Sequence, residues 1–290
     1  MTWPPRPTLS RAFYKAHGLG NDYLVFEEGD DWVATPEAVR AACDRHRGAG
    51  SDGIVVSLRD SPGGALTARM FNPDGSEFER SGNGLRILAS YLWRHGRVTE
   101  EPFSVSVAGD VVQMTIHEVS GTLYDVSVDM GRASIGPASV GLELDTLDDS
   151  GRLLGPGGRA LHVVPVSVGN PHMVVFVTEL TDDLFKSLGP FLATHPGLSN
   201  GANVQLAVPP AGQTVRIAIW ERGVGPTSAS GTSACAVAVA AVSEGLIGAG
   251  EVTVESAGGT LRVSVTPDLD VVLRGPVEEV CEGALANSWR

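Results

Sequence analysis

The sequence predicts an α+β fold built from two pseudo-symmetric domains that derive from an internal duplication. Each domain is expected to wrap a mixed β-sheet around one central helix. Residues 71–89 and 220–240 share one layout: an apolar strand-like segment, a polar turn, a Ser-Gly pair and an apolar run with helical spacing. Equivalent positions keep one separation of 149 residues, as seen for Ser81 and Ser230, Asn21 and Asn170, and Asn72 and Glu221.

The length of 290 residues suffices for two domains, each with its own hydrophobic core. We expect the halves to span residues 1–135 and 150–290, with the last residues free to pack on the first half. Residues 131–158 are rich in Gly, Ser and Asp and show the weakest periodicity, so the crossover between the domains is expected there.

The first half should begin with strands over 12–17 and 23–27, joined by a Gly-rich turn. Thr35 suits an N-cap and Pro36 a first helical turn, which predicts a helix over 35–45. A second helix is predicted over 85–93, where apolar residues recur on one face. The other strands of this half are expected at 54–58, 66–71, 103–107, 111–117 and 124–130.

The second half repeats this series of elements. Helices are predicted over 182–192 and over 232–244, and the latter is rich in Ala and Val. Strands are expected at 162–168, 173–178, 204–208, 215–220, 251–255, 260–265 and 270–273.

Composition limits the classes of function. The net charge of −13 disfavours nucleic-acid binding, and the longest apolar run is far shorter than the ~20 residues of a membrane span. The N-terminus lacks an apolar signal-peptide core, so we expect a cytoplasmic protein with no membrane partner. The three cysteines have no paired spacing, and no metal-ligand motif occurs. Of the two lysines, Lys186 lies in an amphipathic run, so a Schiff-base cofactor is not expected.

The two Ser-Gly pairs lie where helices should begin. A helix N-terminus presents unpaired backbone N–H groups and a partial positive charge, which suit a carboxylate. Two such termini together would hold a small acid. Ser81 and Ser230 can equally be plain N-caps, and the spacing alone leaves both interpretations open.

Motifs along nearly the whole chain resemble those of the diaminopimelate epimerase family of cofactor-independent amino-acid racemases and epimerases. The matching stretches are His17-Gly-Leu-Gly-Asn-Asp22, Cys43-Asp-Arg45, Gly50-Ser-Asp-Gly53, Phe71-Asn-Pro-Asp-Gly-Ser76, Gly82-Asn-Gly84, Gly169-Asn-Pro-His172, Asn203-Val204, Glu221-Arg-Gly-Val-Gly-Pro-Thr227 and Gly231-Thr-Ser-Ala-Cys-Ala236.

The resemblance implies a small amino-acid substrate between the two domains, no cofactor, no metal, and a possible homodimer. The backbone amides of Gly82 and Asn83, and of Gly231 and Thr232, would hold the α-carboxylate. The remaining polar groups of the substrate would be held by Asn21, Asn72, Asn170, Asn203, Glu221 and Arg222.

One departure concerns the catalytic pair. The family uses two cysteines as thiolate base and thiol acid, whereas Ser81 and Ser230 stand at both positions in this chain. A helix N-terminus brings a thiol pKa towards neutrality, but a serine hydroxyl needs an adjacent base. The family places His172 and Glu221 near these positions. Each could relay a proton, or could only bind substrate and support the site.

Three functions therefore remain. The first is a diaminopimelate epimerase-like isomerase of lysine and peptidoglycan-precursor synthesis, slow or inactive because of the two serines. The second is an amino-acid-binding paralogue that has lost its chemistry. The third is an active epimerase in which both cysteines were changed to serine to trap a substrate.

Overall fold

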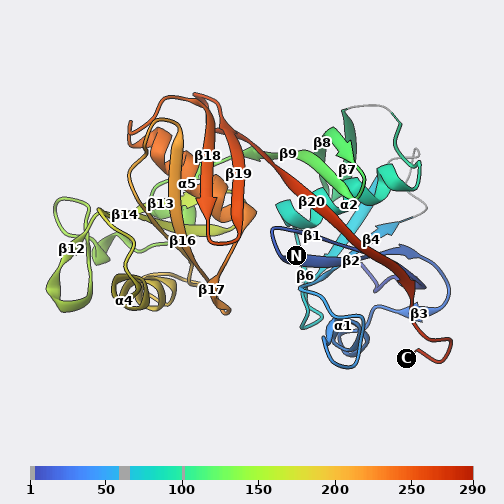
Figure 1. The fold of residues 1–290 in the computed structure, drawn as a ribbon. Coiled ribbons are helices and arrows are strands. Elements are labelled where there is room, and N and C mark those ends of the chain that lie inside the picture. Colours follow the sequence, from blue (N-terminus) through green and yellow to red (C-terminus); the bar gives the residue numbers. More distant parts are fainter. Residues whose placement is uncertain (1–3, 59–65, 100–101, 290) are drawn as a thin grey trace. The chain divides into compact units, whose positions relative to one another are not determined.

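The computed structural model describes residues 4–58, 66–99 and 102–289, and the chain divides into two compact units (Figure 1). The first unit comprises Met1–Asp129 and Gly275–Arg290, and the second comprises Met130–Arg274. The expected crossover at 131–158 lies within the second unit. Its composition is polar, but Val140, Leu142 and Leu153 are buried in the core of that unit, which ties the segment down.

The first unit consists of strands around one long helix. Its helices are α1 (Pro36–Cys43) and α2 (Gly82–Arg94). Its strands are β1 (Thr8–Gly18), β2 (Asn21–Glu28), β3 (Trp32–Val33), β4 (Ile54–Leu58), β5 (Leu66–Phe71), β6 (Glu77–Phe78), β7 (Phe103–Val107), β8 (Asp110–Ser120) and β9 (Leu123–Arg132), whose last residues enter the second unit.

The second unit is also built from strands around one long helix, and it has an additional short helix. Its helices are α3 (Pro137–Val140), α4 (Asp182–Ala193) and α5 (Gly231–Ser243). Its strands are β10 (Ser134–Ile135), β11 (Leu153–Leu154), β12 (Ala160–Leu161), β13 (Val164–Ser167), β14 (Pro171–Phe176), β15 (Asn203–Ala207), β16 (Thr214–Glu221), β17 (Gly225–Thr227), β18 (Gly250–Ser256) and β19 (Gly259–Val265).

Strand pairing follows the same order in both units. In the first, β1 pairs antiparallel with β2, β2 parallel with β4, β4 antiparallel with β5, β5 parallel with β7, and β7 antiparallel with β8. In the second, β13, β14, β15, β16, β18 and β19 repeat this series with the same directions. The short strands β6 and β17 also correspond, because each folds back antiparallel on the strand before it. The pseudo-symmetric α+β architecture is therefore confirmed.

Each sheet wraps around one helix. In Figure 1, α2 lies against β1, β2, β4 and β8, and α5 lies against β13, β14, β15, β16, β18 and β19. In α5, residues 233–241 are buried on every side, as the uniformly apolar sequence of this helix requires. In α2, residues 82–92 are buried, including the charged side chain of Arg86.

The last strand, β20 (Asp270–Ala284), is longer than predicted. Residues 271–274 pair with β19, and residues 278–284 pair with β1 of the first unit. The pair Gly275-Pro276 resembles a strand terminator in the sequence, but the chain continues extended through it. No helix within the described ranges is long and apolar enough to cross a membrane.

Candidate active site

Ser81 caps α2 after the polar turn that follows β6. Its backbone is extended, and its Oγ accepts a hydrogen bond from the Gly84 amide at 3.1 Å. The amide of Leu85 donates the first helical bond, to the Ser81 carbonyl. The amides of Gly82 and Asn83 therefore lie ahead of the helical hydrogen-bond ladder, where an anion can accept from them.

The Asn83 side chain connects α2 to the β1–β2 turn. Its Nδ2 donates to the carbonyl oxygen and to the Oδ1 of Asn21, both at 2.8 Å. Its Oδ1 accepts from Arg86 Nη2 at 3.0 Å, which fixes the orientation of the amide. Gly18 is required beside it, because a Cβ there would overlap Asn83 Oδ1 and lie 2.9 Å from Arg86 Nη2.

Asn21 is held from its other side by a group of charged residues. Its Nδ2 donates to Asp52 Oδ2 at 3.0 Å, and Arg45 bridges Asp52 and Asp22. Lys15 lies 3.0 Å from the Asp22 carboxylate. Burial raises the pKa of Asp22, but hydrogen bonds from Arg45 and Lys15 outweigh it and hold that pKa below its usual value. Asn21 is therefore fixed in place before any substrate arrives.

Tyr23 and Asn72 differ in what their side chains contact. The Tyr23 hydroxyl donates to Ser81 Oγ at 3.5 Å, from a side chain that is almost buried. Asn72, predicted as a substrate ligand, bonds within its own turn, since its Nδ2 donates to Ser76 Oγ at 3.0 Å. We call Ser81, Gly82 and Asn83, together with Asn21 and Tyr23, the Ser81 cluster.

Ser230 occupies the equivalent position before α5, with an extended backbone and a carbonyl that accepts from the Ala234 amide. Within the described residues its hydroxyl makes no capping bond to the first turn, unlike that of Ser81. The amides of Gly231 and Thr232 again precede the helical ladder. Both helix N-termini can thus accept a carboxylate, but only one has its serine committed as a cap.

The half-buried Asn170 and the fully buried His172 and Gln205 support the N-terminus of α5. Asn170 Nδ2 donates to Thr232 Oγ1 at 3.4 Å, and Asn170 Oδ1 lies 2.8 Å from His172 Nε2. His172 Nδ1 lies 3.0 Å from Gln205 Nε2. Burial lowers the pKa of His172 to about 3 and outweighs the hydrogen bond with Gln205, which acts to raise it; the Arg222 charge also lowers it. We call Ser230, Gly231 and Thr232, together with Asn170 and His172, the Ser230 cluster.

The remaining predicted residues lie on neighbouring strands: Glu221 and Arg222 at the hairpin between β16 and β17, and Asn203 at the start of β15. Asn203 Oδ1 accepts from the Arg222 amide at 3.0 Å, and Arg222 Nη1 donates to the Asn200 carbonyl at 2.7 Å. Asn203 and His172 are paired residues of the parallel strands β15 and β14. Glu221 ends β16, opposite Gly225 of β17. The fold thus brings Asn203 and Arg222 together and places them beside the strand that carries His172.

The cysteines lie outside both clusters. Cys43 and Cys235 are buried, Cys281 is exposed, and all three are free thiols. Burial raises the pKa of Cys43 to about 11, so this thiol stays protonated near neutral pH. In the part of the chain that the structure describes, no group of three His, Cys, Asp or Glu side chains could hold a metal ion.

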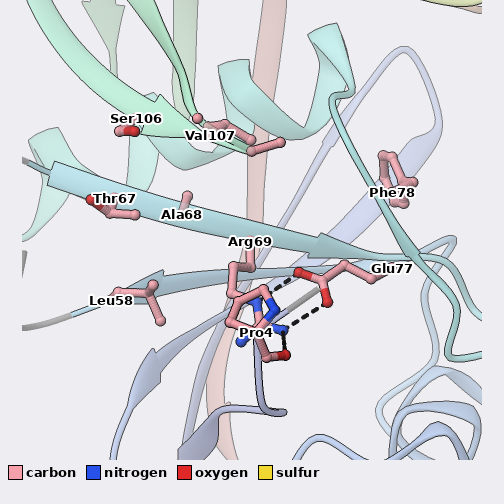
Figure 2. Close-up of a pocket in the computed structure, with 11 residues that line it drawn as sticks. Pro4, Leu58, Thr67, Ala68, Arg69, Glu77, Phe78, Ser106 and Val107 are labelled. Carbon is pink, nitrogen blue, oxygen red and sulfur yellow. Dashed lines mark hydrogen bonds and ion pairs between the residues drawn. The ribbon is translucent and has the colours of Figure 1, made fainter. Parts of the chain in front are cut away.

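A hollow of about 290 Å³ on the first unit contains none of the predicted site residues (Figure 2). Its charged side chains are committed, because Arg69 contacts Glu77 through two hydrogen bonds of 2.6 and 2.7 Å. Arg69 also donates to the carbonyls of Pro4 and Pro5. Among the described residues that line it, this hollow therefore offers no free charge that would bind an amino acid.

Sequence reasoning missed Tyr23, Arg86 and Gln205. Tyr23 and Gln205 lie in predicted strands, and nothing in the sequence around them indicates a role in the site. The detectable signal is a fully buried polar side chain in an otherwise apolar element: Gln205 in β15 and Arg86 in α2 are at most 1% exposed. Such groups need partners, and both have them in the clusters.

The model of the diaminopimelate epimerase family matches residues 13–136 and 164–280, which include both clusters. A diaminopimelate epimerase of Desulforudis audaxviator is 40% identical over 274 residues, covering 93% of this chain and 98% of the relative. A diaminopimelate epimerase 2 of Nostoc sp. is 35% identical over 276 residues, covering 95% of each chain.

The fold also has counterparts among solved structures. A probable proline racemase from Agrobacterium radiobacter superposes with a TM-score of 0.69 at 17% identity, over 96% of this chain and 93% of the racemase. That likeness concerns the fold alone. The family model and the relatives together establish that this chain belongs to the diaminopimelate epimerase family.

Proposed function

We propose that the chain is a diaminopimelate epimerase-like isomerase, which inverts an amino-acid α-carbon by cofactor-free proton transfer. Its place would be in lysine and peptidoglycan-precursor synthesis. One observation carries the proposal: both units present a Ser-Gly helix N-terminus at the same topological position, in a chain 35–40% identical to diaminopimelate epimerases over nearly its full length.

In this proposal the amides of Gly82 and Asn83, and those of Gly231 and Thr232, donate hydrogen bonds to the α-carboxylate of an amino acid, because backbone N–H groups at helix N-termini favour an anion. The exposed guanidinium of Arg222 keeps further N–H groups for a second polar group of the substrate. These contacts bind and orient the substrate and leave the α-carbon to the two serines.

Inversion needs a base that takes the α-proton from one face and an acid that returns a proton to the other. Ser81 Oγ accepts hydrogen bonds from the Gly84 amide and the Tyr23 hydroxyl, so its own proton is the group it can donate. Neither serine ionises near neutral pH without an adjacent base. We therefore propose slow or undetectable turnover for this form of the chain.

The second candidate is an amino-acid-binding protein without turnover. The buried, unprotonated state of His172 favours it, because this imidazole contacts Asn170 and Gln205 and so is occupied away from Ser230. A Cys-to-Ser form of an active epimerase would bind amino acids in the same way. Mass spectrometry of the native protein distinguishes it from a natural binding protein, because only the native epimerase would have cysteines at positions 81 and 230.

The test is deuterium incorporation at the α-carbon of LL- and meso-diaminopimelate in D₂O. The double variant Ser81→Cys with Ser230→Cys should convert slow or absent exchange into rapid epimerisation, because thiols at helix N-termini ionise near neutral pH. Each single variant should exchange the α-proton from one face without efficient inversion.

The matched control is Ser243→Cys, which places a thiol at the C-terminal end of α5, where the helix dipole disfavours a thiolate. It should add no activity. Saturable binding without exchange in the double variant would favour the binding protein, and failure to bind any amino acid would refute both candidates.

We further propose, from the family resemblance alone, that the protein is a cytoplasmic homodimer. Light scattering of the purified chain tests the oligomeric state, and fractionation of the source cells tests the compartment. A monomer at micromolar concentration would remove the first of these proposals and leave the isomerase proposal intact.

A further inference from the structure

A continuous line of hydrogen bonds runs through the interior of the second unit. It joins Ser233 on α5, Gln205 on β15, His172 on β14 and Asn170 before β14. Gln205 Nε2 lies 2.9 Å from Ser233 Oγ and 3.0 Å from His172 Nδ1, and His172 Nε2 lies 2.8 Å from Asn170 Oδ1. Ser233, Gln205 and His172 are fully buried.

The direction of each bond follows from counting hydrogens. The Gln205 amide nitrogen carries two hydrogens and has two neighbours to donate to, Ser233 Oγ and His172 Nδ1. His172 Nδ1 must then offer its lone pair, so the ring proton is on Nε2. This N–H donates to Asn170 Oδ1, which turns Asn170 Nδ2 towards Thr232.

Reversal of the Gln205 amide is unfavourable. Gln205 Oε1 is buried without a hydrogen-bond partner within the described residues. A flipped amide would put both N–H groups at that place and leave two donors unsatisfied in place of one acceptor. Unpaired buried N–H groups are rarer than under-satisfied carbonyl oxygens, so the observed orientation is the stable one.

We propose that Gln205 locks His172 as the neutral Nε2–H tautomer, and that His172 is thereby a positioning residue which aims the Asn170 amide nitrogen at the N-terminus of α5. Besides the Ser230 hydroxyl, the Ser230 cluster then offers a ligand three N–H donors: the Gly231 and Thr232 amides and Asn170 Nδ2. His172 is unable to serve as a base for Ser230, since its one lone pair is held by Gln205.

The proposed tautomer of His172 does not depend on any activity of the protein. The proposed role of Asn170 in binding a carboxylate rests on the proposed function. Burial lowers the pKa of His172, so its ring carries one proton near neutral pH, and the hydrogen bonds above decide which nitrogen holds it.

The lock is tested by NMR of the full chain with ¹⁵N-labelled histidine. At neutral pH, His172 should show a pyridine-like Nδ1 and a pyrrole-like Nε2, with its resonances assigned by their loss in His172→Phe or through the backbone. A protonated Nδ1 in the wild-type chain would overturn the proposal, whatever the protein binds.

The matched variant is Gln205→Glu, which keeps the shape of the side chain and can only accept at Nδ1 when ionised. It should move a proton onto Nδ1, a change that a merely structural role for residue 205 would not produce. Gln205→Leu is the companion variant, which removes the hydrogen bond to His172 Nδ1 without supplying an acceptor. If the Nδ1 state is the same in the wild type and in Gln205→Glu, Gln205 does not set the tautomer.

Calorimetry with meso-diaminopimelate tests whether Asn170 Nδ2 donates a hydrogen bond to the ligand. Asn170→Asp replaces the donor by an oxygen of nearly the same shape and should weaken binding at least tenfold, the factor for losing about 1.5 kcal/mol at a charged partner. Binding unchanged in Asn170→Asp would refute the donor role. If the wild type binds no amino acid while NMR shows the tautomer, the proposed function fails and the lock stands.

Discussion

The two serines should differ in what they contribute to stability, although they occupy equivalent positions. Ser81 Oγ caps α2 through the Gly84 amide at 3.1 Å, whereas Ser230 makes no capping bond within the described residues. Loss of an N-cap costs about 1 kcal/mol. Ser81→Ala should therefore destabilise the first unit by about that amount, and Ser230→Ala should stay within about 0.5 kcal/mol of the wild type.

The local assay is hydrogen exchange of the Gly84 amide in the full chain. A loss of about 1 kcal/mol corresponds to about fivefold faster exchange through local opening. Ser81→Thr is the control, because its hydroxyl can still cap the helix and should restore most of the protection. Equal losses for Ser81→Ala and Ser230→Ala, or unchanged Gly84 exchange, would refute the asymmetry of the two caps.

Three further predictions concern other parts of the clusters. Gly18→Ala should destabilise the first unit by about 1–3 kcal/mol in urea denaturation through overlap with Asn83, whereas Gly248→Ala, which has open space around it, should be close to neutral. The folded-state pKa of Asp22 is depressed, so its contribution is present above about pH 4 and is lost as pH falls through the folded-state value. Asp22→Asn should therefore flatten the acid limb of a stability–pH curve; an unchanged limb would contradict the role of this carboxylate. Arg222→Ala should weaken amino-acid binding by about 1.5–3 kcal/mol in calorimetry, and unchanged affinity would remove Arg222 from the site.

The sequence predicted α1, α2, α4 and α5 but not the four-residue α3, and it misplaced the start of a helix where glycines begin it. The helix expected at 85–93 starts at Gly82, because the Ser81 cap and burial of the whole first turn outweigh the poor helix propensity of Gly82 and Gly84. The sequence also did not predict which strand pairs with the second half of β20. Its second half pairs with β1, and no local pattern in a strand identifies a partner so distant along the chain.

The candidate site residues were likewise predictable from local sequence patterns, but their hydrogen-bond partners were not. Local signals identified Ser81, Gly82, Ser230 and Gly231, since an N-cap followed by glycine and an apolar run is a pattern of neighbours in sequence. Hydrogen-bond partners were not visible in this way. Asn21 and His172 each have a partner far along the chain, and only the folded structure shows that Asn83 bonds Asn21 and that Gln205 bonds His172.

The sequence by itself determined the duplication, the two central helices and the family, because these rest on repeated spacing and on motifs that short-range chemistry defines. Tertiary structure decided which polar groups are already satisfied. Asn72 is bonded within its turn, Ser81 is committed as a cap while Ser230 is not, and His172 is buried between Asn170 and Gln205. The reason is physical: a side chain's free donors, free acceptors and proton affinity depend on neighbours that only the packed fold supplies.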